Sequence, residues 1–216
     1  MSSKIGIIGS GIVGQTLANG FIKHSYQVTI GTNTASKRDE LRARTNGQAM
    51  VGTFEDAAQF GEVVVLATKG IAAEAALNAA GPRNLAGKTV IDTSNPIADA
   101  PPVNGVLQYF TPQNESLMER LQKAAPDARF VKAFSCIGNA YMVDPDFNGQ
   151  KPTMFICGNN DQSKAEVRTI LEQFGHDVAD MGTIESARAI EPLCVLWCIP
   201  GLRGGGWNHA FKLLRK

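Results

Sequence analysis

The sequence predicts an α/β protein: a doubly wound, mainly parallel sheet with helices on both faces, followed by a small helical extension at the C-terminus. Three observations lead to this prediction. Short apolar segments alternate with amphipathic ones along the whole chain, as expected of strands joined by crossover helices. The apolar run within residues 62–67 is unbroken, which is typical of strands buried on both faces. A glycine-rich turn, residues 9–14, lies between the first expected strand and the first helix.

Strands are expected where β-branched and other apolar residues cluster between turn-forming residues. The segment 4–9 contains three isoleucines, and 62–67 contains Val-Val-Val-Leu. In chain order, the expected strands are residues 4–9, 27–32, 49–52, 62–67, 88–92, 129–135, 152–158 and 176–181.

Helices are expected between these strands. Apolar side chains in residues 11–24 recur every three or four positions, which suits a helix packed on a sheet. Ser36 is the expected N-cap of a polar helix, and 183–214 is expected to be mostly helical with breaks at Pro200 and at residues 204–206. In chain order the expected helices are 11–24, 36–44, 54–60, 71–80, 117–125, 162–174 and 183–214. The proline- and glycine-rich stretch 95–111 predicts a long loop, and long loops are often functional.

Composition and charge exclude several classes of protein. The chain is 44% apolar and 19% charged, which argues against disorder. Its formal net charge is +1 without a basic stripe, so we expect no nucleic-acid partner. The most apolar late stretch, residues 192–202, is well short of the roughly 20 residues that cross a membrane. We therefore expect no membrane association and a cytoplasmic location.

The four cysteines do not form a recognisable metal site. Cys194 and Cys198 are four residues apart and would share a helix face, but a second pair of zinc ligands is missing. We predict no metal site and expect Cys136, Cys157, Cys194 and Cys198 to be reduced, mostly buried thiols of a cytoplasmic protein.

Residues 9–14 read Gly-Ser-Gly-Ile-Val-Gly and match the GxGxxG pattern between a strand and a helix, the context that this motif requires. Gly9 permits the tight turn, Gly11 lets the backbone approach a pyrophosphate, and Gly14 lets helix and strand pack closely. The helix N-terminus offers free N–H groups to the anion. The alternative is a glycine-rich turn without a ligand. We predict a Rossmann domain that binds a dinucleotide at Gly9, Ser10, Gly11, Ile12 and Val13.

The end of the second expected strand favours NADP(H) over NAD(H). NAD sites normally carry an acidic residue there, but the first carboxylate here, Asp39, already belongs to the next helix. Hydroxyls, an amide and cations precede it, and these groups suit a 2′-phosphate. The alternative is a solvated helix start in which Lys37 and Arg38 face water. The candidate phosphate ligands are Thr32, Asn33, Thr34 and Lys37.

The carboxyl ends of three further strands complete the predicted cofactor site, because ligands of doubly wound sheets bind there. Small and polar residues at these ends leave room for ribose and nicotinamide. The candidates are Ala67, Thr68, Lys69, Asn95, Pro96, Ala133 and Phe134.

No acid–base constellation is visible, so no catalytic residue is assigned. His24 and His176 are expected at the surface, and His209 in the last helix. This absence suits hydride exchange between two bound redox groups, which depends on stacking and exclusion of water more than on a side-chain base.

These motifs make the chain resemble the deazaflavin (coenzyme F420)-dependent NADP oxidoreductases. It is also similar to the cytosolic reductase domain of the six-transmembrane metalloreductases. The resemblance rests on the glycine loop, residues 32–37, the segment 131–135, the turn 157–161 and the glycine-broken end of the chain. It implies NADPH on the glycine loop and nicotinamide stacked on an 8-hydroxy-5-deazaflavin or a flavin. An arginine is common in the family where Thr34 stands here.

We therefore expect an oxidoreductase that transfers hydride between NADP(H) and a deazaflavin or flavin, a small-molecule redox acceptor. One alternative is a non-catalytic NADP(H)-binding sensor or partner module. Another is reduction of a small carbonyl or imine, which would need a proton donor near Thr68 or Ser94.

The expected division is a dinucleotide-binding domain, residues 1–157, and a small extension, residues 158–216, that closes the cofactor pocket. The alternative is one compact domain. We expect a homodimer in which residues 200–207 cover the second redox partner at the dimer contact, or else form a flexible kink.

Overall fold

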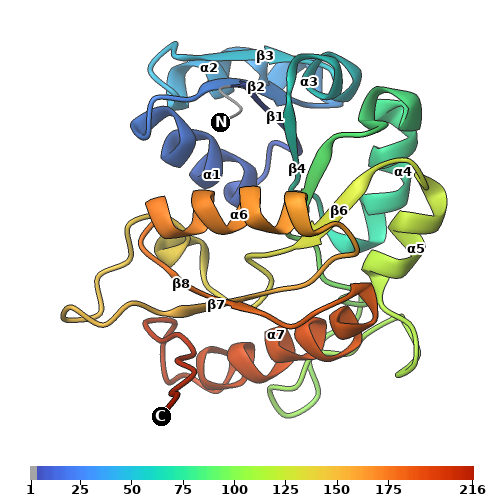
Figure 1. Cartoon of the computed structure of the whole chain (residues 1–216). Helices are drawn as coiled ribbons and strands as arrows, with labels where there is room; N and C mark the ends of the chain where they lie inside the picture. The colour runs from blue at the N-terminus through green and yellow to red at the C-terminus, as the bar shows by residue number, and fades with distance from the viewer. Residues whose placement is uncertain (1–3) are drawn as a thin grey trace.

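A six-stranded parallel sheet forms the centre of the protein (Figure 1), of which the computed structural model describes residues 4–216. Its strand order, β3-β2-β1-β4-β5-β6, reverses direction between β1 and β4, so the doubly wound fold is confirmed. The strands are β1 (Lys4–Ile8), β2 (Gln27–Gly31), β3 (Ala49–Gly52), β4 (Val63–Leu66), β5 (Thr89–Asp92) and β6 (Arg129–Lys132).

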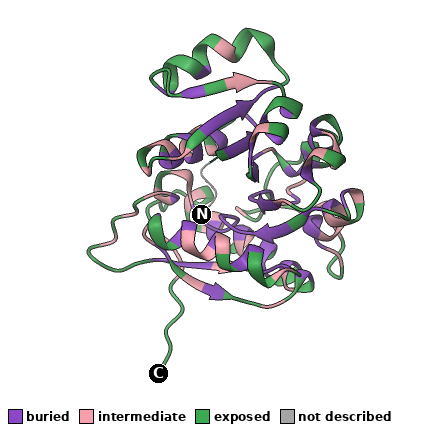
Figure 2. Cartoon of the chain, turned by 45° about the horizontal axis from the view of Figure 1, so that its top comes forward, coloured by how far each residue is buried: buried purple, intermediate pink, exposed green. Residues whose placement is uncertain are grey.

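Helices cover both faces of this sheet, and alternate side chains of each strand point to opposite faces. Val63 and Val65 enter the core under α1, whereas Val64 and Leu66 enter the core under α3 and α4. Figure 2 shows β1, β4 and β5 almost wholly buried, which explains their unbroken apolar sequences. The helices of this part are α1 (Ile12–Lys23), α2 (Arg38–Arg44), α3 (Phe54–Phe60), α4 (Gly70–Ala80) and α5 (Leu117–Ala124).

The C-terminal part adds a second, two-stranded parallel sheet made of β7 (Thr153–Ile156) and β8 (Asp177–Asp180). Helix α6 (Asp161–Gln173) connects the two strands, and α7 (Ala187–Leu202) lies on the other side of them (Figure 1). An antiparallel bridge between Lys132 and Cys157 joins this sheet to β6. Strand β7 precedes the boundary predicted between residues 157 and 158 and β8 follows it, so their pairing crosses this boundary.

Two helix ends differ from the sequence prediction. Ser36 does not cap α2, because residues Ala35–Lys37 form a 3₁₀ turn and the helix begins at Arg38. The expected helix to residue 214 is also wrong, since α7 ends at Leu202.

The end of α7 has a physical cause in its glycines. Gly204 takes a φ of +87°, and the Gly205 N–H bonds to the Pro200 carbonyl at 2.8 Å while the Gly204 N–H bonds to Gly201 at 3.1 Å. This is the Schellman arrangement that closes helix C-termini. Pro200 itself stays inside the helix, so the glycines and not the proline end it.

Two histidines lie in unexpected places. His176 is buried, against the prediction that it lies at the surface, and its Nε2 lies 2.9 Å from the Met142 carbonyl oxygen. His209 lies outside the last helix, where its ring stacks on Trp197 with centroids 5.0 Å apart and its Nε2 contacts the Trp197 carbonyl.

The burial of His176 predicts a pH-dependent stability. Burial lowers the pKa of His176 below the ordinary histidine value of 6.5, so the unfolded chain binds this proton first as pH falls. We expect wild-type protein to lose unfolding free energy as pH falls from about 7 to about 5, and His176→Gln to lose less. Urea titrations across this range measure both curves, and parallel curves would contradict the assignment.

Candidate functional site

The three glycines of the loop after β1 meet different surroundings. A Cβ at Gly9, where φ is +129°, would lie 2.3 Å from the Ala67 carbonyl oxygen, and a Cβ at Gly14 would lie 2.2 Å from the Gly9 carbonyl oxygen. Packing of the protein therefore requires these two glycines. A Cβ at Gly11 would meet no atom within 4 Å. The space beside Gly11 is a cradle open to a ligand, which fits the predicted pyrophosphate.

The N-terminus of α1 is open to an anion. Gly11 is its N-cap and supplies no side-chain hydrogen bond, so the first N–H groups of the helix lack intrahelical partners and face the cradle. The Gln15 side chain holds the loop by donating to the Ser10 carbonyl at 2.8 Å, and the Ser10 hydroxyl donates to Thr32 Oγ1 at 3.0 Å. The loop is thus tied to the end of β2.

The end of β2 lies beside the loop and carries the predicted phosphate ligands. Thr32 is buried, and its hydroxyl accepts the Thr34 N–H at 3.2 Å, whereas Asn33, Thr34 and Lys37 are exposed. Asp39, the first carboxylate after β2, is exposed and paired with Arg42 at 2.8 Å. Asp39 is therefore not an unpaired carboxylate beside the predicted phosphate site.

A cavity of about 490 Å³ opens at the carboxyl ends of β1, β4 and β5, where the strand order reverses. Seven of the residues that line it were predicted from the sequence: Gly11, Ile12, Val13, Ala67, Thr68, Lys69 and Asn95. The sequence analysis did not assign the other lining residues, which are Gly70, Ile71, Thr93, Ser94, Ile97, Ala98 and Asp99. Two of these follow directly on predicted strand ends, and the proline-rich loop was the signal for Ile97–Asp99.

Close packing at Gly70 brings a second helix N-terminus to this cavity. A Cβ at Gly70 would lie 1.9 Å from the Asn95 carbonyl oxygen, so only glycine lets α4 begin against the loop after β5. Lys69, the N-cap of α4, makes no capping side-chain bond. Thr68 and Asn95 both line the cavity, and in the described part of the chain their buried atoms Thr68 Oγ1 and Asn95 Oδ1 have no hydrogen-bond partner.

The remaining predicted residues lie outside the lining of this cavity. Pro96 is buried, and its carbonyl accepts the Phe110 N–H at 2.9 Å. Ala133 and Phe134 are buried in the core; Phe134 takes a φ of +60° and its ring packs against Phe174. Their roles in cofactor binding stay predictions.

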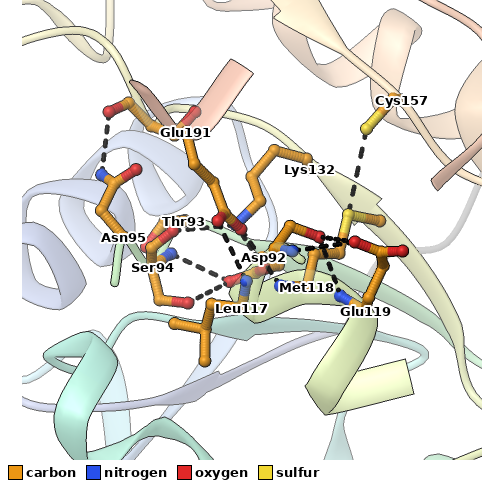
Figure 3. Close-up of polar contacts among 12 residues, drawn as sticks. Asp92, Thr93, Ser94, Asn95, Leu117, Met118, Glu119, Lys132, Cys157 and Glu191 are labelled. Carbon is orange, nitrogen blue, oxygen red and sulfur yellow. Dashed lines mark hydrogen bonds and ion pairs between the residues drawn. The ribbon is translucent and has the colours of Figure 1, made fainter. Parts of the chain in front are cut away.

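A buried cluster of charges lies directly behind the cavity (Figure 3). Lys132 Nζ lies 2.6 Å from Asp92 Oδ2 and 2.9 Å from Glu191 Oε1, and it donates to the Ser94 carbonyl at 2.8 Å. The three charged side chains are at most 1% exposed. Burial alone would lower the pKa of Lys132, but the Asp92 and Glu191 carboxylates raise it above its ordinary value, so the cluster holds a charged lysine.

Glu191 also connects this cluster to two helices. Its carboxylate, carried by α7, accepts the Leu117 N–H at 3.0 Å and the Met118 N–H at 3.1 Å at the start of α5. The Tyr109 hydroxyl donates to the Glu191 carbonyl at 2.6 Å. The sequence analysis missed Glu191 because nothing in its neighbourhood marks a glutamate within an apolar helix as functional.

The comparisons with known proteins agree with this site. A family model described as coenzyme F420-dependent NADP oxidoreductase matches residues 4–96. A crystal structure of a candidate F420-dependent NADP reductase from Arthrobacter sp. FB24 is 33% identical, with full coverage of both chains and a TM-score of 0.91. The chain belongs to the F420-dependent NADP oxidoreductase family.

Other relatives of this chain are longer. Metalloreductase STEAP3 of Rattus norvegicus is 29% identical over 92% of this chain and 38% of its own length. Metalloreductase STEAP2 of Homo sapiens is 28% identical over 88% of this chain and 35% of its own length. The chain thus spans little more than a third of these curated relatives. An imine reductase from Aspergillus terreus, 20% identical with a TM-score of 0.67 over 95% of this chain and 64% of its own, shares the fold.

Two further features are absent from the described part of the chain. Residues 4–216 contain no helix with the length and apolar character needed to cross a membrane. In the same residues, no three His, Cys, Asp or Glu side chains are grouped to hold a metal ion. The cysteines are free thiols, and Cys136, Cys157 and Cys194 are buried.

The glycine loop after β1 gives a direct test of the predicted phosphate site. Gly11→Val should fold with a stability change within about 1 kcal/mol because its Cβ meets open space, yet it should lose NADPH binding because the side chain fills the cradle. Thermal melts and NADPH titrations measure the two effects. Gly14→Val is the matched control and should unfold, since its Cβ would collide with the Gly9 carbonyl. Wild-type NADPH affinity in Gly11→Val would place the phosphate site elsewhere.

Proposed function

We propose that the protein is an NADPH-dependent oxidoreductase that passes hydride between NADP(H) and a deazaflavin or a flavin. The observation that carries this proposal is the open cradle at Gly11, which continues into a cavity with unpartnered polar atoms. The nicotinamide supplies or receives the hydride when the dinucleotide is bound. The family membership supports the NADP half of the reaction, and the family's name supports the deazaflavin half.

Each part of the site has a proposed role. The free N–H groups at the start of α1 and α4 stabilise negative charge of the pyrophosphate. The exposed Lys37, with Thr32, Asn33 and Thr34, binds the 2′-phosphate. Thr68 and Asn95 hydrogen-bond the ribose and nicotinamide part. The apolar side chains of Ile12, Ile71 and Ile97 at the cavity exclude water from the reacting groups.

Two alternatives are distinguished by different observations. A sensor that only holds NADP(H) would use the same cavity of about 490 Å³ for the nicotinamide part, so the acceptor panel below separates it from the oxidoreductase. Reduction of a carbonyl or imine would need a proton donor. The Ser94 hydroxyl does not supply one, because it donates to Asp92 Oδ1 at 2.6 Å, which leaves the unpartnered Thr68 hydroxyl as the candidate donor. The similarity to the imine reductase is a similarity of fold alone and does not support this reaction.

We also propose a cytoplasmic homodimer. The end of α7 lies against the loop at Gly105, where a Cβ would come within 2.7 Å of the Arg203 side chain. Leu202 and Trp207 beside it, with Val103 and Val106 of the loop, are large exposed apolar side chains. Such a surface suits contact with a second copy of the chain.

The cofactor preference is testable by equilibrium binding. NADPH should bind at least about tenfold tighter than NADH, a difference of about 1.4 kcal/mol. The reason is that the Lys37 cation follows β2, whereas the Asp39 carboxylate, which would repel a 2′-phosphate, is paired with Arg42. Lys37→Ala should narrow this gap. Arg44→Ala is the control, since it removes a cation of the same helix that is paired with Glu40 at 2.8 Å, and it should leave the ratio unchanged. Equal wild-type affinities by calorimetry would contradict NADP(H) selectivity.

The acceptor is testable with a panel of redox groups. Purified protein is mixed with NADPH and the deazaflavin, FMN or FAD, and the absorbance of NADPH is followed with time. We expect oxidation with at least one of the three and none with Gly11→Val. Tight NADPH binding without oxidation by any acceptor would instead favour the sensor.

A further inference from the structure

Helix α7 carries two cysteines that the proposed function does not use. Cys194 and Cys198 are four residues apart within the helix, so their side chains lie on the same face, one turn apart. Both are free thiols, and Cys194 is buried whereas Cys198 is half-buried. These two residues, which we call the thiol pair, are therefore reached from solvent on the Cys198 side.

The two thiols interact with each other. A side-chain hydrogen bond joins them, and this bond lowers the pKa of Cys198 and raises that of Cys194. Cys194 thus keeps its proton, and Cys198 is the thiol that ionises first. Since the thiolate is the form that binds metals, Cys198 is the first ligand that the pair offers, and Cys194 becomes the second by releasing its proton.

The spacing of the thiol pair favours a bridging atom over a disulfide. Side chains four residues apart on a helix have Cβ atoms about 5–6 Å apart, whereas a disulfide needs a Cβ separation of about 3.5–4.5 Å. Two metal–sulfur bonds of about 2.3 Å each let the sulfur atoms lie up to about 4.6 Å apart. An intact α7 can therefore hold a metal ion between the two sulfur atoms without bending.

The surroundings of the pair restrict the kind of metal. In residues 4–216, no three His, Cys, Asp or Glu side chains are grouped to hold a metal ion, so zinc would lack its usual four ligands. The Tyr109 hydroxyl is hydrogen-bonded to Cys194, but burial raises the pKa of Tyr109, and the phenol stays neutral. Two thiolates without further ligands suit a soft cation that accepts two-fold coordination, and Cu(I) is such a cation.

We propose that Cys194 and Cys198 bind one Cu(I) ion between their two sulfur atoms. Each S–H bond is replaced by an S–Cu bond and its proton passes to solvent, while the copper remains Cu(I), so the step needs neither an oxidant nor a reductant. Neither cysteine belongs to the lining of the cavity at the strand ends. The thiol pair is thus a second site, and it is independent of the proposed function.

The test titrates reduced protein with Cu(I) in the absence of oxygen, in competition with the coloured chelator bicinchoninate. We expect one Cu(I) per chain, with ultraviolet absorption from the copper–thiolate bonds. Cys198→Ser should weaken Cu(I) binding at least about tenfold, because a hydroxyl is a poor ligand for a soft cation. Wild-type affinity in Cys198→Ser would overturn the proposal.

Two matched cysteine variants serve as controls. Cys157→Ser removes a buried thiol that contacts Met118 Sδ at 4.0 Å, and its Cu(I) affinity should equal that of the wild type. Cys136→Ser removes the buried thiol whose charge acts on Cys194, and the affinity should again hold. A tenfold loss in either variant would overturn the assignment of the ion to the thiol pair.

The second ligand and the choice of metal are tested in the same way. Cys194→Ser should weaken Cu(I) binding as much as Cys198→Ser, and melting temperatures show whether each variant is folded. If Cys194→Ser does not fold, the half-buried position of Cys198 carries the test alone. Zn(II), titrated against a zinc chelator, should bind at least about tenfold more weakly than Cu(I). Equal affinity for the two metals would overturn two-fold coordination.

Discussion

The contact of Lys132 with Asp92 and Glu191 fixes the geometry on which the rest of the site depends. Burying charges costs several kcal/mol per ion, and removing one partner of such a pair costs about 3–5 kcal/mol. One lysine facing two carboxylates leaves a net negative charge, which the N–H groups of Leu117 and Met118 at the start of α5 offset. Strands β5 and β6 and helices α5 and α7 must therefore meet at this point with little freedom to shift.

Because this geometry is fixed, the cavity can use backbone groups on one side and side-chain groups on the other. The anion side uses backbone: an uncapped helix N-terminus after Gly11 and another after Lys69. The polar side uses Ser94 and Asn95, whose orientations follow from hydrogen bonds to Asp92 and to the Ser135 carbonyl. Glycine serves both sides, because Gly70 allows the close approach to Asn95 and Gly11 leaves the open cradle. Rigid support behind such a site keeps its donors and acceptors in place before a ligand arrives.

The fold and the phosphate side of the site were predictable because they depend on local pattern. Apolar runs identified β1 and β4, and the spacing of glycines identified the α1 start. What sequence could not supply depends on tertiary contacts. His176 is buried by tertiary packing, which the residues next to it in the sequence do not indicate. Glu191 lies 59 positions from Lys132, and only the fold brings them within 2.9 Å. The sequence marked the glycine break at residues 204–206, but it did not show that the chain stays non-helical beyond it.

The C-terminal part influences the cavity through the charged side chain of Glu191. The lining comes from residues 11–13, 67–71, 93–95 and 97–99, whereas α7 contributes Glu191 behind Ser94. A displacement of α7 would leave Lys132 with one carboxylate and the α5 N-terminus without its acceptor, at a cost set by the buried charges. Lys132 also holds the Ser94 carbonyl, so the same displacement would loosen the backbone of the loop after β5. The position of α7 and the polarity of the cavity are therefore coupled through one buried ammonium group.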